Sequence, residues 1–215
     1  MYRCVANSVS AFIRQLAVGY VCRGYFFYVQ GRIPAGKDPA RTDEKIIRQY
    51  AIDRSKWAKA RGRKRGEASV QYLRHDREFV ILATHGEHRF FNDEARQIRD
   101  VRREPIKYGG YSVGYWQGFE QGHVSVRIES RRFQELKNYF RQRAGDASAE
   151  DLIQEFTALR FLPFAPVRYQ LLKLGQQINR VRKLAGKEPV PLASLLPTYP
   201  QKRLGGSVQI DSAAG

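Results

Sequence analysis

The sequence predicts an α+β fold with an antiparallel sheet, a helical C-terminal part and an extended tail. Short apolar runs with the spacing of β-strands recur between residues 25 and 129, and helical spacing takes over after Ser130. Beyond Gly186 the chain contains prolines and no hydrophobic period, which predicts an extended segment. We therefore expect a sheet domain over residues 1–145, a helical appendage over residues 146–186 and a tail over residues 187–215.

The N-terminal third should supply a helix, a strand and two further helical stretches. Apolar residues at helical spacing predict a helix from about Ser8 to Val18, and the run Tyr25–Val29 is rich in residues that favour strands. Asp38 followed by Pro39 is a typical helix start. The apolar residues that this helix should turn inwards are Ile46, Ile47 and Tyr50. A second helical stretch should contain Trp57.

Two hairpins should occupy the middle of the chain. The first pairs Val70–Arg74 with Phe79–Ala83, and because the second of these strands is apolar on both faces, it should be central in the sheet. A short helix capped by Asn92 should lead to the second hairpin, which pairs Ile106–Trp116 with His123–Glu129. The resulting order, β-α-β-β-α-β, is that of a split βαβ core, as in ferredoxin-like and RRM-like sheets.

The C-terminal part should consist of helices. An apolar stripe after Ser130 comprises Phe133, Leu136, Tyr139 and Phe140. Ser148, with Asp151 three residues later, has the pattern of a helix cap. A long helix should then run from Val167 to Ala185 and stop at Gly186.

Cysteine content and hydropathy limit the class of protein. The 215 residues include two cysteines, Cys4 and Cys22, whose separation fits neither a zinc site nor a disulfide scaffold. No apolar run approaches the roughly 20 residues of a membrane-spanning helix. Arg14 interrupts the apolar stretch Val9–Val21, which we interpret as an amphipathic helix rather than a signal sequence. We therefore expect a soluble, cytoplasmic protein without a membrane partner.

Positive charge is the most informative property of the sequence. There are 38 lysines and arginines against 21 aspartates and glutamates, which gives a formal net charge of +17. Such a charge favours a polyanionic partner, because binding to phosphates neutralises it and releases their counterions. The densest part is an acid-free run that comprises Arg54, Lys56, Lys59, Arg61, Arg63, Lys64 and Arg65. We expect this run to contact the phosphates of DNA or RNA, with Gly62 and Gly66 keeping it flexible.

Two further surfaces could add to this binding. On the last long helix, basic residues alternate with apolar ones and should face outwards; they are Arg168, Lys173, Arg180, Arg182 and Lys183. Strict alternation in His123–Glu129 should give the second hairpin an apolar face and a polar face. This sheet could stack single-stranded bases through Arg127, Tyr111, Tyr115 and Trp116. In the alternative interpretation, a helix covers the tyrosines.

Histidines offer one route to catalysis. His85 and His88 follow the central strand, and His123 on the second hairpin could join them around a divalent metal that polarises a phosphate. Tyr139 and Tyr169 lie in helical segments and are weak candidates for a nucleophile, because both could equally pack in the core. Two residues separate His85 from His88, whereas single-strand nickases place one apolar residue between their two histidines.

Three functional hypotheses follow from these patterns. The leading one is a non-catalytic nucleic-acid-binding protein that works as a subunit of a mobile-element, replication or defence nucleoprotein complex. The first alternative is a metal-dependent single-strand nuclease or nickase that uses the three histidines. The second is an assembly subunit whose basic face meets an acidic protein. We favour a protein without enzymatic activity and without a cofactor, unless the histidines bind a divalent metal.

Overall fold

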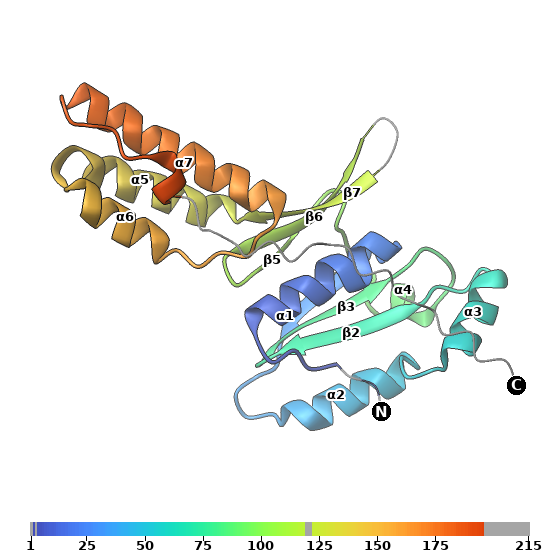
Figure 1. Ribbon diagram of the computed structural model, residues 1–215. Helices are drawn as coiled ribbons and strands as arrows, with labels where there is room; N and C mark the ends of the chain where they lie inside the picture. Colours follow the sequence, from blue (N-terminus) through green and yellow to red (C-terminus); the bar gives the residue numbers. More distant parts are fainter. Residues whose placement is uncertain (1, 3, 119–121, 196–215) are drawn as a thin grey trace, which may run out of the picture.

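The computed structural model describes residues 2, 4–118 and 122–195 and has an α+β fold. A four-stranded antiparallel sheet is followed by a three-stranded antiparallel sheet and by a helical C-terminal part (Figure 1). The α+β class predicted from the sequence is therefore confirmed. No helix in the described part of the chain is long and apolar enough to cross a membrane. Most of the predicted tail, residues 196–215, lies outside the described residues.

The first sheet has the strand order β2-β3-β1-β4, with every neighbouring pair antiparallel. Its strands are β1 (Phe27–Arg32), β2 (Val70–His75), β3 (Glu78–Ala83) and β4 (Arg99–Asp100). β2 and β3 form the predicted hairpin, in whose turn Asp76 has a φ of 52°. β3 lies between β2 and β1, as its apolar faces predict. Val80 and Leu82 belong to one core cluster, and Ile81 and Ala83 belong to another.

Helices cover both faces of this sheet. The N-terminal helix α1 (Val9–Arg14) continues as a π-helical segment, η1 (Gln15–Tyr20), and a 3-10 turn, η2 (Val21–Arg23). This helical unit shares the core cluster of Val80 and Leu82. On the opposite face lies α2 (Pro39–Gln49), which begins at the predicted cap, Asp38, and packs through Ile46, Ile47 and Tyr50.

The second sheet has the order β5-β6-β7. Its strands are β5 (Ile106–Tyr108), β6 (Tyr111–Gln117) and β7 (Gly122–Ile128). Gly109 and Gly110 form the tight turn between β5 and β6 with φ values of 55° and 81°, a conformation that glycine adopts without strain. The segment Ile106–Trp116, predicted as one strand, therefore forms two paired strands. These strands belong to a second sheet and do not extend the first one.

Helices that follow the second sheet pack against it. They are α5 (Ser130–Asp146), α6 (Ala149–Thr157), α7 (Ala165–Leu184) and α8 (Leu192–Leu195). The Ser148 hydroxyl accepts from the Asp151 N–H at 3.0 Å, and Gly186 follows α7 with a φ of 67°, both as predicted. One core cluster joins α1, the second sheet and these helices. Residues 146–186 thus share their core with the sheet region.

Three local predictions need correction. The first strand starts at Phe27, two residues later than predicted, because the N-terminal helical unit extends to Gly24, whose φ is 87°. The helix predicted after Asn92 is instead the short α4 (Arg89–Asp93), and β4 follows it. Residues 187–195, assigned to the tail, pack on α7, where the Asn179 side chain makes two hydrogen bonds to the backbone of Val190.

Candidate nucleic-acid interface

The acid-free basic run folds as helix α3 (Lys56–Lys64). The Ser55 hydroxyl caps the helix by accepting from the Ala58 N–H at 3.2 Å. Gly62 is buried on the inner side of the helix, where a Cβ atom would lie 2.5 Å from Glu67 Oε2. Gly66 has a φ of 83° and follows the end of the helix. The two glycines therefore serve close packing and helix termination, which corrects the expectation that they keep the run flexible.

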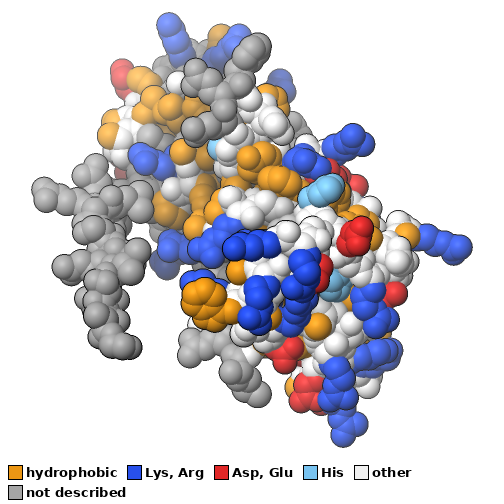
Figure 2. Space-filling model, turned by 90° about the vertical axis from the view of Figure 1, so that its right-hand side faces the viewer, with side chains coloured by type: hydrophobic (Ala, Val, Ile, Leu, Met, Phe, Trp, Pro, Cys, Tyr) orange, Lys and Arg blue, Asp and Glu red, His pale blue; other side chains and the backbone are white. Residues whose placement is uncertain are grey.

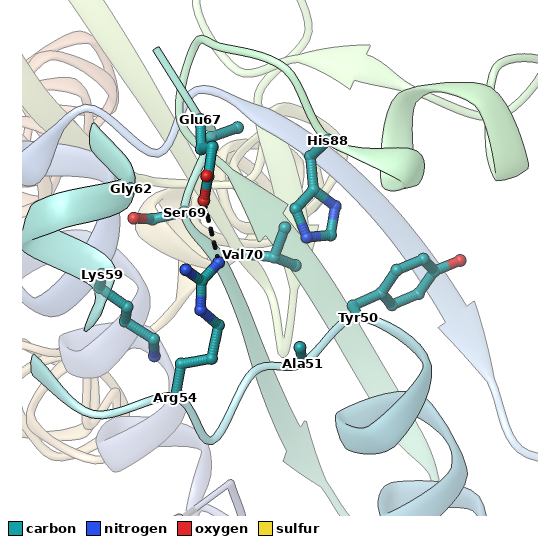
Figure 3. Close-up of a pocket in the computed structure, with 10 residues that line it drawn as sticks. Tyr50, Ala51, Arg54, Lys59, Gly62, Glu67, Ser69, Val70 and His88 are labelled. Carbon is teal, nitrogen blue, oxygen red and sulfur yellow. Dashed lines mark hydrogen bonds and ion pairs between the residues drawn. The ribbon is translucent and has the colours of Figure 1, made fainter. Parts of the chain in front are cut away.

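Glu67 binds both ends of the run. Its carboxylate accepts from Arg54 Nη1 at 3.1 Å (Figure 3) and from Arg65 Nη2 at 2.7 Å. Both hydrogen bonds lower the pKa of Glu67, and the one from Arg65 has the larger effect. Arg54 and Arg65 are therefore paired cations that hold α3 in place, and they are less available to phosphates than the sequence predicts.

Lys59 is also engaged within the protein. Its ammonium lies 5.7 Å from the centroid of the Tyr2 ring, and burial lowers the pKa of this lysine. Together with Arg54, Glu67 and His88, Lys59 lines a small pocket under α3 (Figure 3). The charged groups of this pocket already have partners within the protein. We therefore infer that the residues of this pocket hold α3 in place.

The other cations of the run are exposed: Lys56, Arg61, Arg63 and Lys64. In the ranges that the structure describes, these four side chains have no acidic partner at salt-bridge distance, unlike Arg54 and Arg65. Figure 2 looks onto the side of the molecule that carries α3 and shows Lys and Arg side chains gathered there. We call Lys56, Trp57, Arg61, Arg63 and Lys64 the α3 surface.

Trp57 is the residue of this surface that sequence analysis did not single out. Its side chain is 79% exposed. Within the described part of the chain, no aromatic ring or cation packs on its indole. Arg61 follows Trp57 by four residues and Lys64 follows it by seven, so the three side chains lie along one side of the helix. An aromatic residue that shares one side of a polar helix with two cations is the sequence pattern by which Trp57 could have been found.

A second basic surface runs along α7. The exposed residues Tyr169, Lys173, Arg180 and Lys183 recur at helical spacing, with Arg168 beside them. Lys173 Nζ lies 4.6 Å from the centroid of the Tyr169 ring. A groove between α5 and α7 adjoins this stripe and is lined by Gln134, Lys137, Asn138, Arg141, Gln177, Arg180, Val181 and Leu184. We call Arg168, Lys173, Arg180 and Lys183 the α7 surface.

Arg182 does not belong to the α7 surface, contrary to the prediction. Its side chain is buried, and it donates to two backbone carbonyls, from Nε to Glu188 at 2.7 Å and from Nη1 to Ala147 at 2.9 Å. Arg182 follows Ile178 by four residues and therefore lies on the packed face of α7. Its role is structural, because it ties the end of α5 to the segment that follows α7.

The second sheet exposes only part of the predicted stacking platform. Trp116 is 62% exposed, and Arg127 is exposed on the same face of the sheet. Tyr111 is buried, and its hydroxyl accepts from the Leu162 N–H at 2.9 Å. Tyr115 is half-buried against the core. Tyr111 therefore cannot stack on bases as predicted, because its ring is buried in the core. Tyr115 packs on Phe26 with part of its ring, with 4.6 Å between the ring centroids, and its predicted stacking stays a prediction, as does that of Trp116 and Arg127.

The three predicted metal ligands do not converge. His88 caps α4, since its Nδ1 accepts from the Phe90 N–H at 3.1 Å, and burial lowers its pKa. His85 lies exposed beyond β3, and His123 lies exposed on β7 in the other sheet. Throughout the described ranges, no group of three or more His, Cys, Asp or Glu residues is placed to hold a metal ion. Cys4 and Cys22 are free thiols.

Tyr139 and Tyr169 lie on helices, as predicted. Their side chains are 47% and 58% exposed. The Tyr139 ring packs edge-on against Phe140, with 5.2 Å between the ring centroids, and Lys173 covers the ring of Tyr169. Among the described residues, neither hydroxyl has a hydrogen bond to an imidazole or a carboxylate. A tyrosine nucleophile needs a neighbouring base, and the described residues place none beside either hydroxyl.

Two polar clusters that sequence analysis missed stabilise the fold. Buried Asp43 on α2 accepts from the Tyr72 hydroxyl at 2.6 Å and from Arg74 Nε at 2.8 Å. Burial, and then the hydrogen bond to Asp43, raise the pKa of Tyr72. His75 Nδ1 lies 2.6 Å from the Tyr108 hydroxyl and links β2 to β5. Helical spacing could have identified Asp43, because it precedes two inward-facing isoleucines by three and four residues.

Comparison with known protein families and with curated proteins finds no match to this sequence. Function is therefore inferred from the two basic surfaces. Each consists of cations on the exposed side of a helix with an aromatic ring among or beside them, Trp57 on α3 and Tyr169 on α7. This arrangement suits a ligand with phosphates and flat rings.

Proposed function

We propose that this protein binds nucleic acid by contacting phosphates through the α3 surface. The observation that carries the proposal is the set of exposed cations on one helix, Lys56, Arg61, Arg63 and Lys64, for which the described residues supply no acidic partner. These cations repel one another until phosphates lie among them, and the release of counterions then favours binding. Phosphate contacts read no sequence, so we expect affinity without strong sequence preference.

The α7 surface is the second contact that we propose. Figure 1 shows α7 and α3 at opposite ends of the molecule, so one short strand does not reach both. We propose that α3 provides the primary contact, because its cations are the denser set, and that α7 engages the more distant part of a longer nucleic acid. The polar groove beside α7 adds Lys137 and Arg141 to this second surface.

The topology of the first sheet supports a more specific assignment of the fold. Helices α2 and α3 connect β1 to β2, and α4 lies between β3 and β4, with β1 and β3 in the centre of the sheet. We propose that this is a split βαβ unit of the ferredoxin-like type whose fourth strand is shortened. Because such sheets host many unrelated functions, the fold by itself supports no reaction. The setting that we propose is a non-catalytic subunit of a mobile-element, replication or defence nucleoprotein complex.

A charge reversal on α3 tests the proposal. We expect the combined variant Lys56→Glu, Arg61→Glu, Arg63→Glu and Lys64→Glu to bind labelled DNA and RNA at least tenfold more weakly, for all sequences alike. The slope of log affinity against log salt should also become shallower. Each lost phosphate contact removes about 0.9 from this slope on duplex DNA and about 0.7 on single strands.

The matched control reverses four exposed cations in and before α2. It combines Lys37→Glu, Arg41→Glu, Lys45→Glu and Arg48→Glu, which changes the net charge by the same amount. We expect this control to keep the wild-type salt slope and most of the affinity. Equal losses in both variants would show that net charge, and not the α3 surface, determines binding. A wild-type protein whose affinity does not depend on salt would also overturn the proposal.

A further inference from the structure

The exposed indole of Trp57 is a feature that phosphate binding does not explain. Tryptophan side chains are on average largely buried, whereas this one is 79% exposed. The inner side of α3 is formed by other residues, among them Ala58 and buried Gly62. The packing of the helix therefore does not require an aromatic side chain at position 57.

The neighbours of Trp57 determine which ligand could cover it. Arg61 lies about 6 Å further along the helix axis and Lys64 about 10.5 Å, both on the same side of the helix. An apolar protein surface that covered the indole would remove water from these unpaired cations, which is unfavourable. A nucleotide strand offers a flat aromatic face for the indole and phosphates for the cations beside it.

The backbone that carries Trp57 is held in place. Glu67 is hydrogen-bonded to Arg54 before the helix and to Arg65 at its end, and Gly62 packs closely against the same carboxylate. The Ser55 cap fixes the first turn, in which Trp57 lies. Because the scaffold is already ordered, little conformational entropy is lost when a ligand binds.

We infer that the α3 surface binds single-stranded nucleic acid, with the indole of Trp57 stacked on an unpaired base and with Arg61 and Lys64 on neighbouring phosphates. The inference rests on the proposed function and adds the class of strand. In a duplex, neighbouring base pairs cover the face of each base, whereas an unpaired base can stack on an exposed aromatic side chain. Such stacking tolerates any sequence, because every base has a π-face.

Tryptophan fluorescence tests this inference directly. The chain contains two tryptophans, so in a Trp116→Phe variant the emission reports Trp57 alone. We expect a single-stranded oligonucleotide to quench this emission and the duplex of the same sequence to leave it unchanged. In the otherwise wild-type protein, Trp57→Ala should weaken single-strand binding about tenfold and leave duplex binding unchanged, and Trp57→Phe should retain part of the affinity. Circular dichroism should show normal melting, because the substituted side chain is exposed.

The outcomes separate this inference from the proposed function. If the wild-type protein binds neither single strands nor duplexes, both fail. If charge reversal on α3 abolishes binding but Trp57→Ala binds single strands as tightly as wild type, phosphate binding stands and the stacking inference is wrong. Quenching by polyglutamate but not by a single strand would assign the α3 surface to an acidic protein and would also overturn the inference.

Discussion

Single polar side chains hold in place the helices and strands that surround the basic surfaces. Glu67 fixes both ends of α3, and His88, in the same pocket, caps α4. Asp43 binds Arg74 and Tyr72 on the opposite side of the sheet from α1. In each case a partly or fully buried polar group has its hydrogen-bond partners, as folded proteins require. Acidic residues are fewer than basic ones in this chain, and these two acids pair with arginines that hold the fold together. Among the described residues, the cations of the α3 and α7 surfaces have no acidic partner at salt-bridge distance.

The Asp43 cluster gives a prediction about stability. Removing its carboxylate by Asp43→Ala leaves the half-buried Arg74 side chain and the buried Tyr72 hydroxyl without their carboxylate partner. We expect the free energy of unfolding to fall by about 3–5 kcal/mol, measured by urea denaturation. Glu44→Ala removes an exposed acid from the next position and should change stability by less than about 0.5 kcal/mol. Equal unfolding midpoints for the two variants would contradict the structural role of Asp43.

At the scale of helices and strands, local patterns predicted most elements correctly. The β2–β3 hairpin, the starts of α2 and α6 and the end of α7 follow from turn residues, caps and periodicity within a few positions. The division into two sheets does not follow from such patterns, because it depends on which distant strands pair. His88 as a cap was missed because histidine is not a typical cap residue, and the sequence therefore suggested Asn92.

The candidate site was predictable to a similar degree. The sequence indicated the α3 run, because charge density is visible without a structure. It did not distinguish Arg54 and Arg65, which Glu67 engages, from the exposed cations, because that distinction depends on how the chain folds back after Gly66. Arg182 was assigned to the wrong face of α7, although its helical position relative to Ile178 marks it as inward.

The central position of β3 gives a prediction at this scale. Ile81 is 3% exposed, and Ile81→Asp would bury a carboxylate among apolar side chains. The cost is several kcal/mol, comparable with the whole stability of a domain, so we expect the variant to be absent from the soluble fraction. Ser112→Asp places the same carboxylate on the open face of β6 opposite Arg127 and should fold normally. A soluble Ile81→Asp protein with normal thermal melting would show that β3 is not a central strand.

At the scale of the whole molecule, the α3 and α7 surfaces are carried by two separate helices. The core is continuous from α1 through the second sheet to α8, so the orientation of α7 relative to the first sheet is fixed by packing. The α3 and α7 surfaces lie at opposite ends of this packed body (Figure 1). Substitutions on the two surfaces should therefore act independently, because the two helices lie far apart.

This separation predicts that the effect of the α7 surface depends on the length of the nucleic acid. In the arrangement that we propose, the α3 surface alone binds a strand of a few nucleotides. Reversing the α7 cations with Arg168→Glu, Lys173→Glu, Arg180→Glu and Lys183→Glu should then leave the affinity for this strand unchanged. A strand long enough to reach both helices gains phosphate contacts on α7, and the same variant should bind it more weakly and with a shallower salt slope. The affinities of the short and the long strand should be measured for wild type, the α7 variant and the α2 control. Comparison of the two variants distinguishes a loss of contacts on α7 from an effect of net charge. If the α7 variant weakened binding of short and long strands equally, the two surfaces would form one site, and the arrangement proposed above would be wrong.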